Sequence, residues 1–226
     1  MGLRNNLSAI ALESVIQSSI KGLNDYLHDR LGDDKTIRLC DIGNTYNGLS
    51  GKCGEDFGFG FPYITYLNVY KNSIVDPNMV GNVTIGETEV QNITRYGDAL
   101  FTLSSETACE VGVSAICLDD CDGMYLNSFC FGYRLHDFSI LNPTYLPYCF
   151  SSSRFRRFIL PFAQGSTRYN LNKSDFVKSY FKTPTIESQI KIANVLNIYT
   201  QKIHNEKGIL STYNRQKEYL LQNLFI

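Results

Sequence analysis

Apolar residues spaced by three and four positions dominate both ends of the chain. Near the N-terminus this spacing predicts an amphipathic helix over residues 7–31. After Thr185, a candidate N-cap, it predicts one long helix over residues 186–226. Positions of this helix that form a heptad seam are Leu196, Tyr199, Ile203, Glu206, Leu210, Tyr213, Lys217, Leu220 and Leu224. A seam this narrow and mostly apolar is typical of a coiled coil, so the helix is expected to pair with another helix.

Residues 35–185 carry a different pattern, in which short apolar runs rich in β-branched and aromatic residues are separated by turn signals. Such runs predict strands over residues 37–42, 63–69, 99–103, 113–118 and 129–133. Short helices are predicted over residues 143–162 and 173–180. The predicted fold is therefore a mixed α/β domain over residues 35–185. An N-terminal helical segment over residues 1–34 precedes it, and a long coiled-coil-type helix follows it.

The chain is nearly neutral, but its basic residues are unevenly distributed. The 226 residues include 21 Lys and Arg against 22 Asp and Glu, and the net charge of -1 excludes a uniformly basic coat for nucleic acid. Residues 151–185 nevertheless hold seven basic residues and one acidic residue. This segment either supplies a local basic patch or is an ordinary solvated face, and the sequence leaves both interpretations open.

The expected location is the cytoplasm, with no membrane partner. No apolar run approaches the roughly 18 residues that span a bilayer, and the first residues lack the basic and apolar regions of a secretory signal. In a chain without such a signal, the seven cysteines are expected to be reduced thiols.

Two motifs could be taken for a methyltransferase site. Residues 57–61 (FGFGF) are similar to the glycine loop that binds S-adenosylmethionine, and residues 142–145 (NPTY) are similar to a motif that holds a flipped adenine. Such a glycine loop needs a helix after it, whereas a strand-like run follows here. Four cysteines with His136 lack the spacing of zinc ligands. We therefore expect no catalytic residue, no cofactor and no metal.

Four stretches together resemble the specificity subunit of type I restriction-modification systems. They are residues 61–72 (FPYITYLNVYKN), 96–107 (YGDALFTLSSET), 162–176 (FAQGSTRYNLNKSDF) and 184–196, the last leading into the long helix. The Gly-Ser-Thr-Arg-Tyr-Asn run of the third stretch is the most specific, while Leu103 stands where the family commonly has arginine. The resemblance covers residues 37–226 and leaves residues 1–31 without a clear match.

The resemblance implies a protein with no chemistry of its own that reads double-stranded DNA. Members place target recognition domains on the duplex and hold two of them apart with long helices. The methyltransferase (modification) subunits dock on this scaffold and methylate adenine, and the restriction subunit joins through the complex. With one recognition domain and one clear spacer helix, this chain looks like half of the usual subunit, either as a natural half-length protein or as a piece of a longer one.

The resemblance and the basic segment together select candidate DNA contacts. Side chains of Arg, Asn, Tyr, Ser and Thr in turns are the ones that reach bases and phosphates. The candidates are Tyr66, Asn68, Lys71, Ser104, Ser105, Arg154, Arg156, Ser166, Thr167, Arg168, Tyr169 and Asn170. Structural alternatives stay open for two groups. Residues 164–170 could be a turn whose polar groups satisfy the backbone, and residues 66–71 could be an ordinary half-exposed strand.

The unpaired heptad helix predicts a homodimer. Its contacts would be the apolar seam positions Leu196, Tyr199, Ile203, Leu210, Tyr213, Leu220 and Leu224. Antiparallel pairing would place two identical domains at opposite ends and give a bipartite target with inverted halves. The alternative class is a helix-dimerised interaction protein or decoy that binds the methyltransferase subunit without reading DNA.

Overall fold

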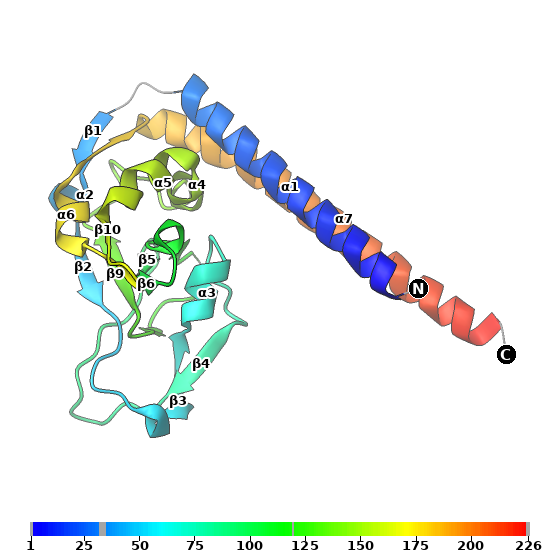
Figure 1. Ribbon diagram of the computed structural model, residues 1–226, viewed down its shortest axis with the longest axis horizontal. Helices are drawn as coiled ribbons and strands as arrows, with labels where there is room; N and C mark the ends of the chain where they lie inside the picture. The colour runs from blue at the N-terminus through cyan, green and yellow to red at the C-terminus, as the bar shows by residue number, and fades with distance from the viewer. Residues whose placement is uncertain (1, 32–34, 119, 225–226) are drawn as a thin grey trace.

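The computed structural model describes residues 2–31, 35–118 and 120–224, with the side chains of residues 14–31, 35–118 and 120–223. Figure 1 shows a mixed α/β domain from which two long helices project side by side. Helix α1 (Gly2–Arg30) leads toward the domain and α7 (Ile186–Leu224) leads away from it, so the two are antiparallel. The predicted fold class, with its long C-terminal helix, is confirmed.

A four-stranded antiparallel sheet forms the centre of the domain. Its strands, in order across the sheet, are β2 (Gly43–Asn47), β9 (Cys130–Leu135), β5 (Ala99–Thr102) and β7 (Ser114–Ile116). The strands predicted over residues 99–103, 113–118 and 129–133 are confirmed to within about two residues at each end. Successive side chains of a strand point to opposite faces, so Leu100 and Phe101 of β5 lie in two separate core clusters.

Three smaller sheets complete the described part of the domain. Their strands are β4 (Val80–Val83), β3 (Phe57–Ile64) and β8 (Tyr125–Leu126) in one sheet; β10 (Ala163–Gln164), β11 (Tyr169–Leu171) and β6 (Ser104–Ser105) in the next; and β1 (Lys35–Arg38) with β12 (Tyr180–Thr183) in the last. The second of these sheets joins residues that lie about 60 positions apart in the chain.

Two of the predicted strands turn into helix partway along, so those predictions were wrong over part of their length. In residues 37–42, β1 ends at Arg38 and the helical turn α2 (Leu39–Ile42) follows. In residues 63–69, β3 ends at Ile64 and α3 (Tyr66–Lys71) begins. The physical reason is an N-cap: the Thr65 hydroxyl accepts a hydrogen bond from the Asn68 backbone N–H at 3.2 Å.

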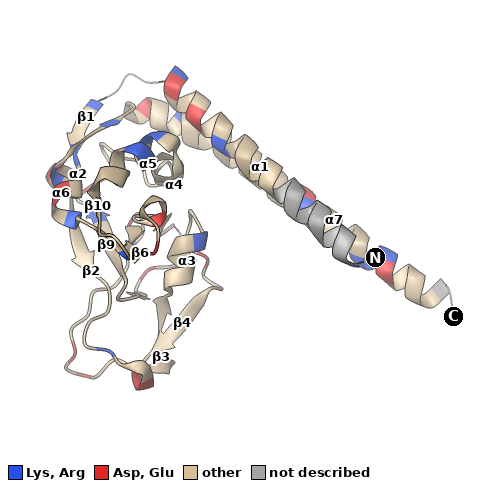
Figure 2. Ribbon diagram, viewed as in Figure 1, with Lys and Arg blue, Asp and Glu red and all other residues tan. Residues whose placement is uncertain are grey.

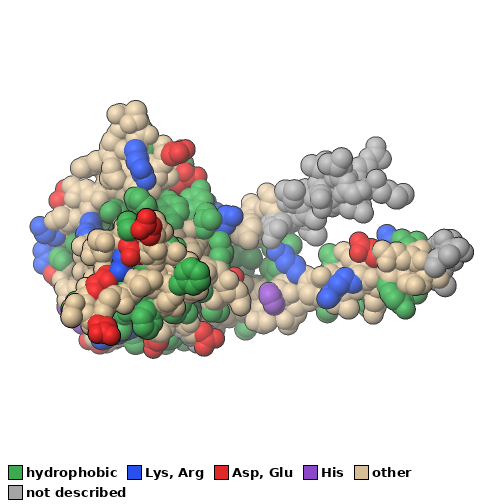
Figure 3. All heavy atoms as spheres, turned by 90° about the horizontal axis from the view of Figure 1, so that it is seen from below, with side chains coloured by type: hydrophobic (Ala, Val, Ile, Leu, Met, Phe, Trp, Pro, Cys, Tyr) green, Lys and Arg blue, Asp and Glu red, His purple; other side chains and the backbone are tan. Residues whose placement is uncertain are grey.

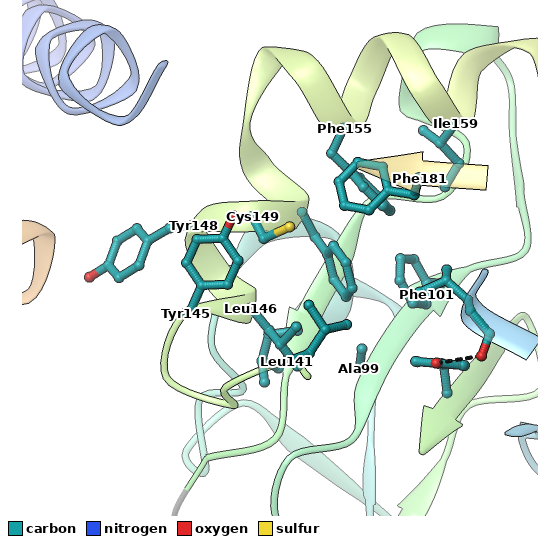
Figure 4. Close-up of a cluster of buried hydrophobic side chains, with 14 of the residues drawn as sticks. Ala99, Phe101, Leu141, Tyr145, Leu146, Tyr148, Cys149, Phe155, Ile159 and Phe181 are labelled. Carbon is teal, nitrogen blue, oxygen red and sulfur yellow. Dashed lines mark hydrogen bonds between the residues drawn. The ribbon is translucent and has the colours of Figure 1, made fainter. Parts of the chain in front are cut away.

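Short helices cover one face of the main sheet. They are α4 (Leu146–Ser151), α5 (Ser153–Ile159) and α6 (Lys173–Lys178). Elsewhere along the chain there are 3-10 turns, η1 (Gly54–Asp56), η2 (Ala108–Glu110) and η3 (Leu160–Phe162). Figure 4 shows Phe155 and Ile159 of α5 above Phe101 of the sheet. The Phe155 ring lies 4.4 Å from the Phe150 ring and 6.3 Å from the Phe101 ring, centroid to centroid. Burial of each such side chain stabilises the layer by about 1.5–3 kcal/mol.

The first turns of α7 belong to the core of the domain. Ile192, Ala193 and Leu196 are fully buried there. The expectation that Leu196 lies exposed in a dimerisation seam was therefore wrong, because its own domain covers it. The predicted N-cap is confirmed: the Thr185 hydroxyl accepts from the Ser188 N–H at 3.5 Å.

Helix α1 docks on α4 and α5 through polar contacts. The Asp25 carboxylate accepts hydrogen bonds from the Ser153 N–H at 2.9 Å and from its hydroxyl at 2.6 Å. The His28 ring lies 2.7 Å from the Tyr145 hydroxyl oxygen and is buried. The chain thus has a second long helix beside α7, in the segment that the family resemblance left unmatched.

One pair of cysteines contradicts the expectation of reduced thiols. Cys117 and Cys121 form a disulfide bond, both ends of which are buried. The other cysteines are free: Cys40, Cys53, Cys109, Cys130 and Cys149. In the described ranges, no helix combines the length and the apolar character that crossing a bilayer requires.

Candidate nucleic-acid interface

Three distant segments of the chain meet at one open cleft. Its walls are α3, β6 with the η2 turn, and the connection between β10 and β11, and its volume is about 540 Å³. The residues that line it are Tyr66, Leu67, Tyr70, Ser104, Ser105, Glu106, Glu110, Phe129, Thr167 and Arg168. Among the predicted DNA contacts, the structure therefore brings together Tyr66, Ser104, Ser105, Thr167 and Arg168.

The turn that carries Arg168 is fixed by strand pairing and by one glycine. Strand β11 pairs with β6, with Tyr169 opposite Ser105, and with β10 across the turn. Gly165 has a φ of +137°, and a Cβ there would lie 2.1 Å from the Arg168 carbonyl oxygen. The backbone of residues 164–170 is thus structural, as one alternative held, while the side chains of Ser166, Thr167 and Arg168 remain exposed.

The Arg168 side chain lines the cleft and is oriented by two contacts. Its guanidinium donates to the Ser104 hydroxyl at 3.2 Å and lies 5.7 Å from the centre of the Phe129 ring. In the described part of the chain, no carboxylate lies within ion-pair distance of it. These contacts orient the guanidinium and leave most of its five N–H donors available to a ligand.

A carboxylate and two stacked tyrosines also line the cleft. The Tyr66 and Tyr70 rings, one helical turn apart on α3, stack at 6.0 Å. The Tyr66 hydroxyl donates to the Ser104 carbonyl oxygen at 3.0 Å, and the Tyr70 hydroxyl donates to Glu110 at 2.5 Å. Sequence reasoning did not select Glu110. No local pattern marks it, because Tyr70 and Glu110 lie 40 positions apart in the chain and only folding brings them together.

Two predicted contacts are engaged inside the protein. Asn68 is fully buried, and its side-chain amide donates to the carbonyl oxygens of Asp76 and Met79. Arg156 donates to the carbonyl oxygens of residues 109, 111 and 112 at 2.7, 2.9 and 3.1 Å. Burial lowers the pKa of Arg156. These two side chains hold loops in place, so the prediction that they face DNA needs correction.

The remaining predicted contacts lie outside the lining of the cleft. Lys71, Ser166 and Asn170 are exposed, and Tyr169 is half-buried. Arg154 lies on α5, near His28 of α1. Burial lowers the pKa of His28, and the positive charge of Arg154 lowers it further.

The basic segment does not form a single patch. Figure 2 shows its Lys and Arg residues divided among α5, α6 and the nearby strands. Lys173, for example, donates to the Asn47 side chain at 2.7 Å and lies over the Phe131 ring. Positive charge for a ligand therefore comes from separate points on the domain.

The two methyltransferase-like motifs have structural roles. Residues 57–61 lie in β3, which pairs with β4, and the Asn142 side chain accepts from the Thr144 N–H at 2.9 Å in a local turn that precedes buried Tyr145. Within the described residues, no group of three or more metal-binding side chains is close enough to hold an ion.

The fold is that of solved type I specificity subunits. The chain is similar to the HsdS subunit from Thermoanaerobacter tengcongensis, with 15% identity, a TM-score of 0.56 and 91% of this chain matched to 49% of that chain. It is also similar to the type-I restriction-modification S subunit from M. genitalium, with 14% identity, a TM-score of 0.54 and coverages of 85% and 46%. A third similar chain comes from a structure of the complex assembly of the type I R-M system. It has 15% identity and a TM-score of 0.55, and 98% of this chain is matched to 54% of that chain. The chain thus spans about half the length of these relatives.

The amino-acid sequence matches the model of a known protein family. Residues 35–214 match the model of the type I restriction modification DNA specificity domain, so the chain belongs to that family. The resemblance drawn from the sequence is confirmed. Comparison with curated proteins returned no match.

Proposed function

We propose that this chain reads a specific double-stranded DNA sequence for a type I restriction-modification complex, through the cleft around Arg168. The observation that carries the proposal is the position of the most family-like turn. It holds an oriented guanidinium, with no carboxylate partner in the described ranges, beside the aromatic wall of α3. Such a guanidinium is the group that most commonly reads guanine, through O6 and N7. Family membership supports the same role.

The charge of the cleft favours contact with bases over contact with phosphates. Its lining carries one basic side chain, Arg168, against the carboxylates of Glu106 and Glu110. A phosphate would be repelled there, whereas base edges offer both donors and acceptors. Exposed cations at the rim, such as Lys71 on α3, would supply the phosphate contacts and with them the salt dependence.

The chain has no catalytic role in this proposal. It would act in the cytoplasm and position adenine methyltransferase subunits on a bipartite target, and the restriction subunit would join through the complex. We infer that a second copy of the chain joins it in the scaffold, because apolar side chains of the distal part of α7 are exposed.

The distal part of α7 supports pairing between two copies. Figure 3 shows apolar side chains along it, and those of the predicted seam are between 51% and 64% exposed: Tyr199, Leu210, Tyr213 and Leu220. Ile203 is partly buried, and the Leu224 side chain lies outside the described residues. Soluble proteins seldom leave such a stripe uncovered, and a twofold axis through it would give a target with inverted halves.

The proposal is tested by expressing the chain with a type I methyltransferase subunit and sequencing the methylated adenines. We expect one recurrent motif of two inverted halves separated by an unread spacer. Arg168→Ala should abolish the motif, whereas Arg157→Ala, which changes an exposed arginine of α5 outside the cleft, should preserve it. Absence of any motif with the wild-type chain, or a motif that Arg168→Ala leaves intact, contradicts the proposal.

A further inference from the structure

We propose that Glu110 determines part of the sequence specificity: its carboxylate accepts a hydrogen bond from the exocyclic amino group of a cytosine in the DNA target. This inference rests on the proposed function of the cleft and names one base that the cleft reads. The contact would be made in the major groove, where the edge of cytosine presents its N4 amino group as a donor.

The Glu110 carboxylate is held by side chains from two walls of the cleft. One oxygen, Oε1, accepts from the Tyr70 hydroxyl at 2.5 Å. The other, Oε2, accepts from the Thr107 hydroxyl at 2.7 Å and from the Ser105 hydroxyl at 3.0 Å. A carboxylate held from α3 and from β6 pays little conformational entropy when a ligand binds.

The same hydrogen bonds leave one accepting position. A carboxylate offers about four lone-pair sites, two on each oxygen. Both sites of Oε2 are taken, and one site of Oε1 is taken by Tyr70. One site of Oε1 therefore remains for a donor, and Glu110 lines the open cleft where a base edge would lie.

The backbone that carries Glu110 is also fixed. Arg156 holds the carbonyl oxygens on either side of it, those of Cys109 and Val111, and the Thr102 hydroxyl donates to the Glu110 carbonyl oxygen at 3.3 Å. A side chain that reads sequence must hold its position to within about half an ångström, and these hydrogen bonds restrain the loop toward that end.

The carboxylate stays ionised at neutral pH. Hydrogen bonds from Tyr70, Thr107 and Ser105, in that order, lower the pKa of Glu110. An ionised carboxylate has no proton to donate, so it cannot pair with a base that presents only acceptors at that point.

Cytosine fits this carboxylate better than the other bases. Guanine presents acceptors at N7 and O6, which would repel Glu110 and suit Arg168 instead. Adenine presents a donor at N6, but its neighbouring N7 acceptor would also face the carboxylate. Glu110 and Arg168 therefore have complementary tasks, and a G·C pair satisfies both.

Glu106 offers a matched control in the same cleft. It is exposed and also lines the cleft, but the hydroxyls of Tyr70, Thr107 and Ser105 donate to Glu110 rather than to it. A mobile carboxylate contributes less to discrimination because binding must first order it.

The experiment is a binding selection with the full chain and a randomised duplex pool, followed by sequencing of the bound DNA. We compare wild type, Glu110→Gln, Glu106→Gln and Tyr70→Phe, each checked for folding by its thermal transition. Glutamine offers a donor and an acceptor, the pattern that pairs with adenine N7 and N6. Glu110→Gln should therefore change the preference at one position from cytosine toward adenine by roughly tenfold or more. Tyr70→Phe should weaken the cytosine preference at that position, and Glu106→Gln should leave the cytosine preference at that position in place.

Each outcome separates this inference from the proposed function. A wild-type selection that enriches no sequence overturns the proposed function and this inference with it. Enrichment by the wild type that Glu110→Gln leaves unchanged overturns the inference alone, as does a change that follows Glu106→Gln instead. Should Glu110→Gln fail to fold, the Tyr70→Phe selection decides: an unchanged cytosine preference counts against the proposal.

Discussion

Replacing Arg156 with alanine should lower the thermal stability of the chain without removing a DNA contact. The Arg156 guanidinium, on α5, donates to three carbonyl oxygens of residues 109–112 at 2.7–3.1 Å. It thereby ties the loop that carries Glu110 to the helical layer. The sequence suggested a phosphate contact for this residue, so the two interpretations predict different results.

The size of the effect follows from the three hydrogen bonds. Bonds to a charged group contribute about 1.5–3 kcal/mol each, but they share one side chain and are not additive. Water that enters the vacated space would replace part of the loss. We expect a destabilisation of about 2–4 kcal/mol, which for a chain of this length lowers Tm by roughly 4–16 °C.

The assay is thermal unfolding of Arg156→Ala, Arg156→Lys and Arg157→Ala, followed by DNA affinity below each transition. Arg156→Lys should lose about half as much stability, because one ammonium cannot reach three carbonyl oxygens. Arg157 is exposed, so its alanine variant should stay within about 0.5 kcal/mol of wild type. An unchanged Tm for Arg156→Ala together with a large loss of DNA affinity would show that Arg156 contacts phosphate and is not a clamp.

Three further changes test other parts of the structure. Leu196→Asp should unfold the domain, whereas Leu210→Asp should leave the Tm nearly unchanged and convert a dimer into a monomer in sedimentation; a wild-type monomer would refute the dimer. Gly165→Ala should disrupt the turn at Arg168 and weaken DNA binding at least tenfold in a mobility-shift titration, because its Cβ would meet a carbonyl oxygen; unchanged binding would refute the assigned turn. Burial lowers the pKa of His28 below 6.5, so its contribution to stability is full above pH 6.5 and is lost as pH falls through the lower folded value; His28→Gln should remove that part of the pH dependence of Tm, and an unchanged profile would contradict it.

Local patterns predicted the parts of the fold that local physics controls. The long α7 helix follows from its apolar spacing and from Thr185, and β5 follows from an apolar run that is buried on both faces. The turn at residues 165–170 was found because its residue types and order resemble the family. The structure shows why a glycine stands in this turn: Gly165 adopts a positive φ that other residues avoid.

Tertiary contacts decided the rest. Residues 63–69 read as one apolar run, and only the Thr65 cap separates the strand from α3. Asn68 and Arg156 look like exposed polar residues in the sequence, but the loops that they hold come from other parts of the chain. Glu110 became part of the site only when folding placed it beside Tyr70, about 40 residues away in the chain.

The most direct test of DNA reading through this cleft is a pair of affinities at one fixed salt concentration. The full chain is titrated with the duplex that the selection enriches and with a scrambled duplex of equal length and composition. We expect the enriched duplex to bind roughly 10³-fold more tightly than the scrambled duplex, and Arg168→Ala to remove most of this difference. Equal affinity for the two duplexes would contradict sequence-specific recognition by this chain.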